Sequence, residues 1–199
     1  MKRIVLFGDS TMMGFRDGKA SDILAKRIRK DFPGYEVINM SISDYKTNNA
    51  MTRVDRVKRL NPAVVILGFG VNDISTDDEI KPGKFAANLT NIIETLGSSK
   101  VILLSPPYID WIKDPTRPWT RQLQFELVTE HLSKQLDVSY IDLLHDMANC
   151  DNLNDLLQAD GLHFTKQGYS LLEDELIPEI KATLTNNQLV SNQRSTLWI

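Results

Sequence analysis

Apolar residues occur along this chain in short runs that alternate with longer amphipathic stretches. A short apolar run that ends at turn residues is typical of a strand in a buried sheet. The stretches between these runs repeat their apolar residues every three or four positions, which is typical of helices with one buried face. Strands are predicted at residues 4–7, 36–40, 63–69, 101–104 and 138–141. Helices are predicted at residues 20–32, 48–60, 85–96, 120–136 and 165–184, the last interrupted or kinked near Pro178.

Five alternations of strand and helix predict an α/β fold, a doubly wound sandwich with a parallel sheet covered on both faces. Residues 105–119 hold four prolines and several aromatic residues, so they are predicted to form an irregular loop. Long loops in compact domains are often functional.

The 199 residues are expected to form one domain at residues 1–185, followed by a tail at residues 186–199. No repeat, low-complexity tract or linker divides the chain. The tail lacks periodicity, and its last residues, Leu197-Trp198-Ile199, fit a homo-oligomer contact and an unstructured end equally well.

Composition narrows the range of partners and compartments. A net charge of -3 gives no reason to expect a nucleic-acid partner. No apolar run is long enough to span a membrane, and the run after Lys2-Arg3 is too short for a signal peptide. A single cysteine, Cys150, suits a reducing compartment, so a cytoplasmic location is expected.

Polar residues follow three of the predicted strands, and a fourth polar block precedes the last helix. Ligands and chemistry collect beyond the carboxyl ends of the strands in open parallel sheets. All four blocks can therefore meet at one edge of the sheet. They are Gly8-Asp9-Ser10, residues 41–44, Gly70-Val71-Asn72-Asp73 and Asp160-Gly161-Leu162-His163.

These blocks supply the groups that a serine needs to cleave an ester, namely a base, an acid that orients the base, and donors for the oxyanion. Ser10 is the candidate nucleophile and His163 the candidate base. Asp160 could bind Nδ1 of His163 and leave Nε2 facing Ser10. The peptide N–H of Ser10 and the amide of Asn72 could donate to the oxyanion. Asp9 is expected to hold the turn by accepting backbone N–H bonds.

The blocks Phe7-Gly8-Asp9-Ser10, Gly70-Val71-Asn72-Asp73 and Asp160-Gly161-Leu162-His163, in this order, resemble the SGNH hydrolase family, also called GDSL-type esterases and lipases. The resemblance implies a flavodoxin-like, three-layer α/β/α sandwich with a five-stranded parallel sheet. It also implies a hydrolase that needs no metal or organic cofactor. The roles it implies are Ser10 as nucleophile, His163 as base with Asp160 as its partner, Ser10 and Asn72 as oxyanion donors, and Gly70 as the residue that lets the backbone pass close to the site.

One block departs from the family pattern. The family usually has a glycine in the loop after the second strand, and the N–H of that glycine completes the oxyanion hole. The aligned position here is Asp44, and an alternative placement on Ser41 stays open. We hypothesise that Asp44 adopts the left-handed backbone, donates through its N–H and turns its carboxylate to solvent, where it repels the oxyanion least.

The sequence therefore predicts a serine esterase that forms an acyl-enzyme on short-chain acyl or aryl esters. A carbohydrate O-acetylesterase and a lysophospholipase-like enzyme use the same residues and stay open. A flavin-binding, flavodoxin-like protein and an inactive relative are the alternatives from other classes.

The chain has no His-Glu-x-x-His and no paired Cys, so no metal site is predicted. No role is assigned to His131 or His145. An acyl pocket and a packed lid are equally good explanations for Met12, Met13, Phe15, Tyr108, Trp111 and Trp119.

Overall fold

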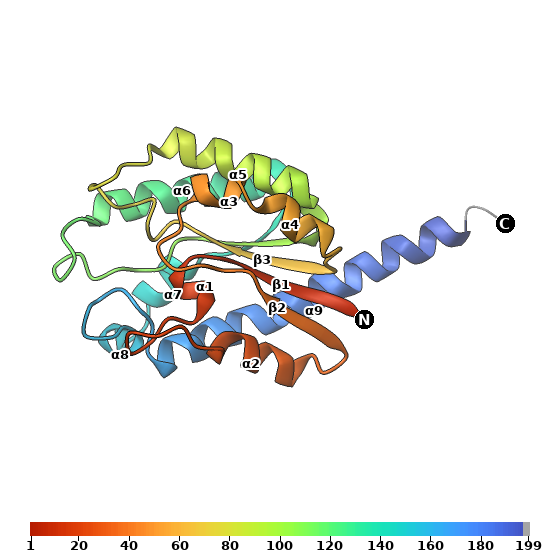
Figure 1. The fold of residues 1–199 in the computed structure, drawn as a ribbon, viewed down its shortest axis with the longest axis horizontal. Coiled ribbons are helices and arrows are strands. Elements are labelled where there is room, and N and C mark those ends of the chain that lie inside the picture. Colours follow the sequence, from red (N-terminus) through yellow and green to blue (C-terminus); the bar gives the residue numbers. More distant parts are fainter. Residues whose placement is uncertain (197–199) are drawn as a thin grey trace.

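The computed structural model describes residues 1–196 and contains one sheet of five parallel strands (Figure 1). The Leu197-Trp198-Ile199 end therefore lies outside the described residues. The strand order β2-β1-β3-β4-β5 places the first strand next to the centre. The strands are β1 (Lys2–Gly8), β2 (Tyr35–Asn39), β3 (Val64–Gly68), β4 (Val101–Leu104) and β5 (Ser139–Ile141). This arrangement confirms the predicted α/β sandwich with five parallel strands.

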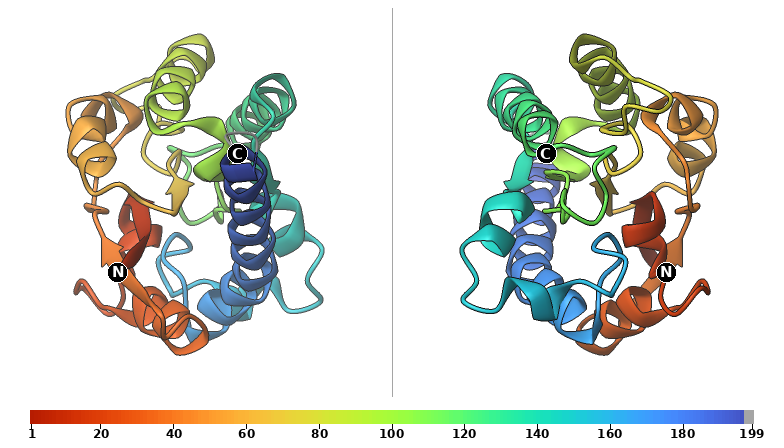
Figure 2. Two further views of the ribbon diagram at one scale, coloured as in Figure 1. Left: turned by 90° about the vertical axis from the view of Figure 1, so that its right-hand side faces the viewer. Right: turned by 90° about the vertical axis from the view of Figure 1, so that its left-hand side faces the viewer.

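Helices cover both faces of the sheet, which explains why the central strands are almost entirely apolar (Figures 1 and 2). Alternate residues of β1 enter different cores. Ile4 and Leu6 pack with α2 and α9, whereas Val5 and Phe7 pack with α3 to α6. The covering helices are α2 (Ile23–Asp31), α3 (Thr47–Met51), α4 (Val54–Arg59), α5 (Pro82–Leu96), α6 (Trp119–Leu136) and α9 (Lys166–Thr196).

The remaining elements are short and lie between the larger ones. They are α1 (Ser10–Met13), the 3-10 helix η1 (Ser98–Lys100), α7 (Leu143–Ala148) and α8 (Leu153–Leu156). The helix predicted at residues 48–60 is divided into α3 and α4. Residues 105–118 form the irregular loop that the prolines predict.

The end of the last helix differs from the prediction. The sequence predicts a helix that stops at residue 184 and is interrupted or kinked near Pro178, but α9 runs through Pro178 without interruption. It continues to Thr196 (Figure 1). Residues 185–196 include no glycine or proline, and each residue added to an existing helix gains a backbone hydrogen bond. A helix can therefore continue where the apolar periodicity has ended. No helix within residues 1–196 combines the length and the apolar character needed to cross a membrane.

Candidate active site

Ser10 lies at the junction of β1 and α1, and the backbone there is tightly constrained. Asp9 caps α1 because its Oδ1 accepts a hydrogen bond from the Thr11 N–H at 3.0 Å. A Cβ added to Gly8 would lie 2.1 Å from the Gly68 carbonyl oxygen, so only glycine lets β1 and β3 approach this closely. These contacts hold Ser10, which is 3% exposed, at the carboxyl end of β1.

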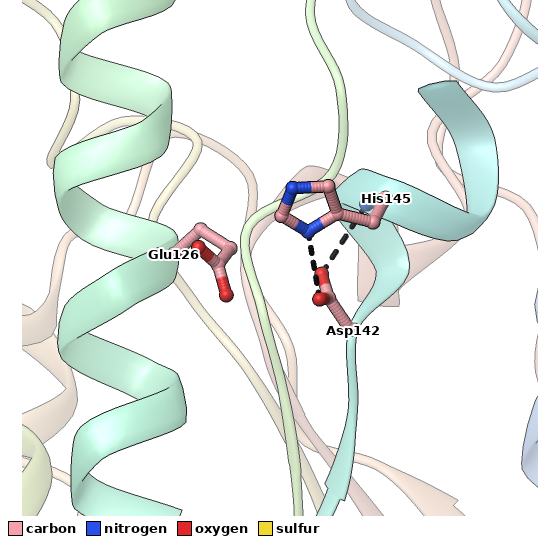
Figure 3. Close-up of side chains that lie close together, drawn as sticks. All are labelled: Glu126, Asp142 and His145. Atoms are coloured by element: carbon pink, nitrogen blue, oxygen red, sulfur yellow. Dashed lines mark hydrogen bonds and ion pairs between the residues drawn. The ribbon is translucent and has the colours of Figure 1, made fainter. Parts of the chain in front are cut away.

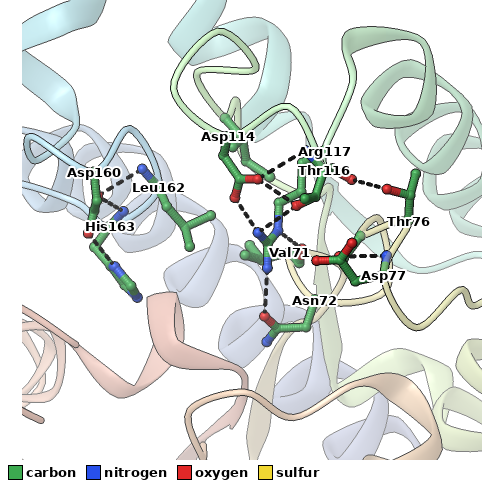
Figure 4. Close-up of polar contacts among 12 residues, drawn as sticks. Val71, Asn72, Thr76, Asp77, Asp114, Thr116, Arg117, Asp160, Leu162 and His163 are labelled. Carbon is green, nitrogen blue, oxygen red and sulfur yellow. Dashed lines mark hydrogen bonds and ion pairs between the residues drawn. The ribbon is translucent and has the colours of Figure 1, made fainter.

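Asp160 and His163 form a hydrogen-bonded pair in the turn before α9. Asp160 Oδ2 lies 2.8 Å from His163 Nδ1, and Asp160 Oδ1 accepts the backbone N–H groups of Leu162 and His163 at 2.9 and 3.0 Å (Figure 4). Burial raises the pKa of Asp160, but these hydrogen bonds outweigh it and leave the pKa below the ordinary value. A charged Asp160 thus fixes His163 with Nε2 turned away from the carboxylate.

Contacts on either side of Phe15 hold this turn against α1. The Phe15 N–H donates to the Ser10 carbonyl at 3.0 Å, and the Phe15 and His163 rings lie 4.6 Å apart. Gln158 links the same segments, since its N–H donates to the His163 carbonyl at 2.7 Å and its side chain reaches the Phe15 carbonyl. The Ser10 hydroxyl makes no hydrogen bond within residues 1–196. Catalytic hydrogen bonds are often long without substrate and tighten when it binds.

Asn72 comes from the loop after β3, where Gly70 has a φ of 134°. A Cβ at Gly70 would lie 2.5 Å from the Pro106 ring, so glycine is required for this packing. Asn72 Nδ2 donates to the Tyr45 carbonyl at 3.1 Å, and Asn72 Oδ1 accepts from Arg117 at 3.3 Å. One of the two Nδ2 hydrogens remains free for a ligand.

The third candidate donor, Asp44, has a φ of 63° and is exposed, which agrees with the hypothesis of a left-handed residue facing solvent. The alternative, Ser41, already donates its backbone N–H to Asn39 Oδ1 at 3.0 Å. Among residues 1–196, the backbone N–H groups of Ser10 and Asp44 have no hydrogen-bond acceptor. The geometry therefore favours Asp44 over Ser41 as an oxyanion donor.

Two buried carboxylates, Asp9 and Asp73, directly neighbour Ser10 and Asn72 in the chain. Burial raises the pKa of Asp9 to about 7, and the nearby charge of Asp73 adds to the effect. Burial also raises the pKa of Asp73 to about 6, although its carboxylate accepts the Thr47 N–H at 3.0 Å and the Thr47 hydroxyl at 2.5 Å. Asp9 Oδ2 is buried without a hydrogen-bond partner in the described part of the chain.

The aromatic and methionine residues have different surroundings. Met12 is buried in the core beneath Gly8 and Gly68, which excludes it from an open acyl pocket. Tyr108 packs against Trp119 with ring centroids 5.9 Å apart, whereas Trp111 is exposed. Phe15, whose ring is tilted by 43° against the His163 ring, is the aromatic residue that lies beside the candidate base.

The loop at residues 105–118 joins two of the candidate blocks, a role that the sequence did not predict. Arg117 binds the Asn72 block, and the Asp110 N–H donates to the Gly161 carbonyl at 2.9 Å. An arginine in an irregular loop carries no spacing signal, so only the folded contacts identify Arg117.

Among residues 1–196, one group of side chains has ligand atoms close enough to hold a metal ion, Glu126, Asp142 and His145, with those atoms within 4.8 Å of one another (Figure 3). Asp142 already binds His145, through Oδ2 to Nδ1 at 2.7 Å and through Oδ1 to the backbone N–H at 3.2 Å. This hydrogen bond raises the pKa of His145. Protonated His145 can balance the carboxylates, so the group needs no ion to explain it.

Asp142 and His145 repeat the spacing and the contacts of Asp160 and His163. The surroundings separate the two pairs, because His145 faces Glu126 of α6 (Figure 3), whereas His163 lies against the ring of Phe15, shortly after α1. The second pair therefore offers a natural control for the first.

Comparison with known proteins gives consistent matches over most of the chain. The model of the GDSL-like Lipase/Acylhydrolase family matches residues 6–171. The mouse (Mus musculus) isoamyl acetate-hydrolyzing esterase 1 homolog is 28% identical over 202 residues, which cover 88% of this chain and 80% of that protein.

Two solved structures illustrate the match in three dimensions. A lipase/acylhydrolase from Enterococcus faecalis has a TM-score of 0.88 and 36% identity over 92% of this chain and 96% of its own. The psychrotrophic esterase EstA from Pseudoalteromonas sp. has a TM-score of 0.70 and 21% identity over 93% of this chain and 100% of its own, and thus shares the fold.

Proposed function

This chain belongs to the GDSL-like lipase/acylhydrolase family and is a carboxylic ester hydrolase, and we propose that it works through an acyl-enzyme on Ser10. One set of contacts supports the proposal. The Asp160–His163 pair lies against Phe15, whose N–H bonds to the Ser10 carbonyl. The backbone N–H groups of Ser10 and Asp44 and one hydrogen of Asn72 Nδ2 are left to donate to a ligand.

In the proposed reaction, Ser10 Oγ attacks the ester carbonyl while His163 Nε2 takes the hydroxyl proton. Asp160 holds the N–H of His163 Nδ1 and stabilises the imidazolium. The carbonyl oxygen becomes an oxyanion and accepts hydrogen bonds from the free N–H groups of Ser10, Asp44 and Asn72.

The intermediate collapses when His163 returns its proton to the departing alcohol. A water molecule then attacks the acyl-enzyme, and His163 accepts a proton from this water. The bond between the acyl carbon and Ser10 Oγ then breaks, His163 gives its proton to Oγ, and the carboxylic acid leaves.

For the substrate, we propose esters of short-chain acids with small alcohols. The mouse relative bears the name of an isoamyl acetate-hydrolysing esterase homolog, and the chain covers most of its length. We also propose a cytoplasmic location, because a chain with a single cysteine, Cys150, suits a reducing compartment.

The test compares Ser10→Ala, His163→Ala and His145→Ala with the wild type on p-nitrophenyl acetate, and then on a series of longer acyl chains and acetylated sugars. We expect Ser10→Ala and His163→Ala each to lower kcat by about a thousandfold or more. His145→Ala is the matched control and should keep kcat within about twofold, because its pair lies beside α6.

Wild-type activity in Ser10→Ala would refute the proposed nucleophile. Equal losses in His145→Ala and His163→Ala would refute the assignment of the base. Faster turnover of long acyl chains or of acetylated sugars than of acetate esters would refute the proposed substrate class.

A further inference from the structure

Arg117 holds the loop that carries Asn72 and is itself largely enclosed. Its side chain, 14% exposed, donates from Nε to the Val71 carbonyl at 2.7 Å and from Nη2 to Asn72 Oδ1 at 3.3 Å (Figure 4). Nη1 pairs with Asp114, which lies three residues earlier in the same loop. The planar guanidinium of Arg117 therefore donates to both the backbone and the Asn72 side chain of the candidate oxyanion loop.

The contact with Asn72 Oδ1 determines which way the amide points. An asparagine amide has an oxygen acceptor and an NH2 donor at nearly equivalent positions. A guanidinium only donates, so a flipped amide would place two sets of donors against each other. The flip is thereby disfavoured, and Nδ2 keeps one hydrogen on the Tyr45 carbonyl and the other free. Since Tyr45 follows Asp44, this bond also links the Asn72 amide to the segment that carries the Asp44 N–H.

The charge of Arg117 acts in the same direction as its geometry. A hydrogen bond from a charged donor polarises the amide more strongly than a neutral one, and the polarised N–H is a better donor to an anion. A positive charge behind the amide also favours a developing negative charge in front of it, especially where water is partly excluded. Asp114 fixes the plane of the guanidinium.

Arg121 lies in the first turn of α6, four residues after Arg117, and provides a comparison for the role of Arg117. It donates to the backbone carbonyls of Ile74 at 2.6 Å and Asp73 at 3.4 Å, and it pairs with Glu79 at 2.7 Å. Arg121 thus secures the same loop without touching the Asn72 side chain. A loss of kcat that comes only from loosening the loop should therefore appear when either arginine is replaced.

We infer that Arg117 is a positioning residue that orients and polarises the Asn72 amide for the oxyanion. This inference rests on the proposed function, since it assigns Arg117 a part in the same site.

The experiment is a double-mutant cycle of Arg117→Ala and Asn72→Ala, with Arg121→Ala as the control in both backgrounds. The measurements are kcat and KM on p-nitrophenyl acetate, together with the melting temperature of each variant. Removing one oxyanion donor typically lowers kcat by about a hundred- to thousandfold. We expect Arg117→Ala to lower kcat by about ten- to a hundredfold with little change in KM, because the donor is misplaced rather than lost.

In the Asn72→Ala background, Arg117→Ala should lower kcat by less than about threefold further, since the amide it acts on is gone. Arg121→Ala should lower the melting temperature but keep kcat within about threefold, and its effect should be the same in both backgrounds. Arg117→Lys repeats the cycle with the charge retained. One ammonium lacks the planar fork that reaches Val71 and Asn72 together, so kcat should fall about five- to tenfold only when Asn72 is present.

The inference would be overturned if Arg117→Ala and Arg117→Lys each lowered kcat by the same factor with and without Asn72. It would also be overturned if Arg121→Ala lowered kcat as much as Arg117→Ala does. A rise in KM without a fall in kcat would also overturn it. Ser10→Ala separates the two claims. If that variant is inactive while the cycle is additive, the inference about Arg117 fails and the proposed nucleophile stands.

Discussion

Asp9 is a buried carboxylate directly beside the proposed nucleophile, and its titration should be measurable in the stability of the fold. Its pKa of about 7 in the folded protein compares with an ordinary value of 3.8. Between about pH 4 and pH 7, the folded protein holds a proton that the unfolded chain has lost, so the free energy of unfolding falls as the pH rises through this window. Stability from this proton is complete below pH 4 and absent above pH 7.

Asp9→Asn removes this titration but keeps an oxygen that can accept the Thr11 N–H. We expect the melting temperature of the wild type to fall relative to that of Asp9→Asn between pH 4 and pH 8, as followed by circular dichroism. Asp73 remains in both proteins, so the difference reports the titration of Asp9 together with its charge coupling to Asp73. Parallel melting curves across this range would exclude a protonated Asp9.

Asp44 tests whether a backbone donor can be provided by a residue other than glycine. Its exposed side chain and its φ of 63° leave the N–H free to serve the oxyanion. Asp44→Gly should therefore keep kcat within about twofold at both pH 6 and pH 8, since the donor is unchanged and water screens the lost charge. A large gain in kcat would show that the carboxylate repels the oxyanion.

At the scale of single residues, the motifs predict the groups that we propose for the reaction but not the residues that support them. Ser10, Asn72, Asp160 and His163 were named from the sequence because their spacing in three blocks is specific. Arg117 was not, because its partner Asn72 lies 45 residues earlier in the chain. The sequence placed this donor at Asp44 and left Ser41 open as an alternative, and the bond from the Ser41 N–H to Asn39 Oδ1 favours Asp44.

Among the elements, the junction between β1 and α1 depends most on a single residue. A Cβ at Gly8 would lie 2.1 Å from the Gly68 carbonyl and 2.4 Å from the Met12 side chain. Gly8→Ala should therefore destabilise the fold by about 3 kcal/mol or more, because backbone cannot move aside as a flexible side chain can. Gly34→Ala is the matched control, since nothing lies within 4 Å of an added Cβ there. Urea denaturation of both variants measures the difference, and equal midpoints would contradict the close approach of β1 and β3.

Strand positions were predictable at this scale, whereas one helix end was not. Buried strands produce apolar runs that stand out in the sequence, and all five fall within a few residues of the prediction. The end of α9 depends on backbone hydrogen bonds that leave no apolar pattern, so the prediction stopped where the pattern stopped.

Considered as a whole, the molecule brings four distant parts of the chain together at one edge of the sheet. The sequence predicted this meeting from the rule for parallel strands. The bonds from Asn72 to Tyr45 and from Ile42 to Gly8, and the ring contact between Phe15 and His163, are consistent with it. The interval between aspartate and histidine alone does not distinguish His163 from His145, because both follow an aspartate by three residues, and the sequence prediction of His163 depends on the order of the three blocks. Only the fold sets them in different surroundings.

The most direct test of this account is labelling with a fluorophosphonate, which phosphonylates an activated serine, followed by intact mass and peptide mapping. We expect one adduct per chain on Ser10, none in Ser10→Ala, much slower labelling in His163→Ala and a wild-type rate in His145→Ala. An adduct on another residue, or labelling that is independent of His163, would contradict the proposed site.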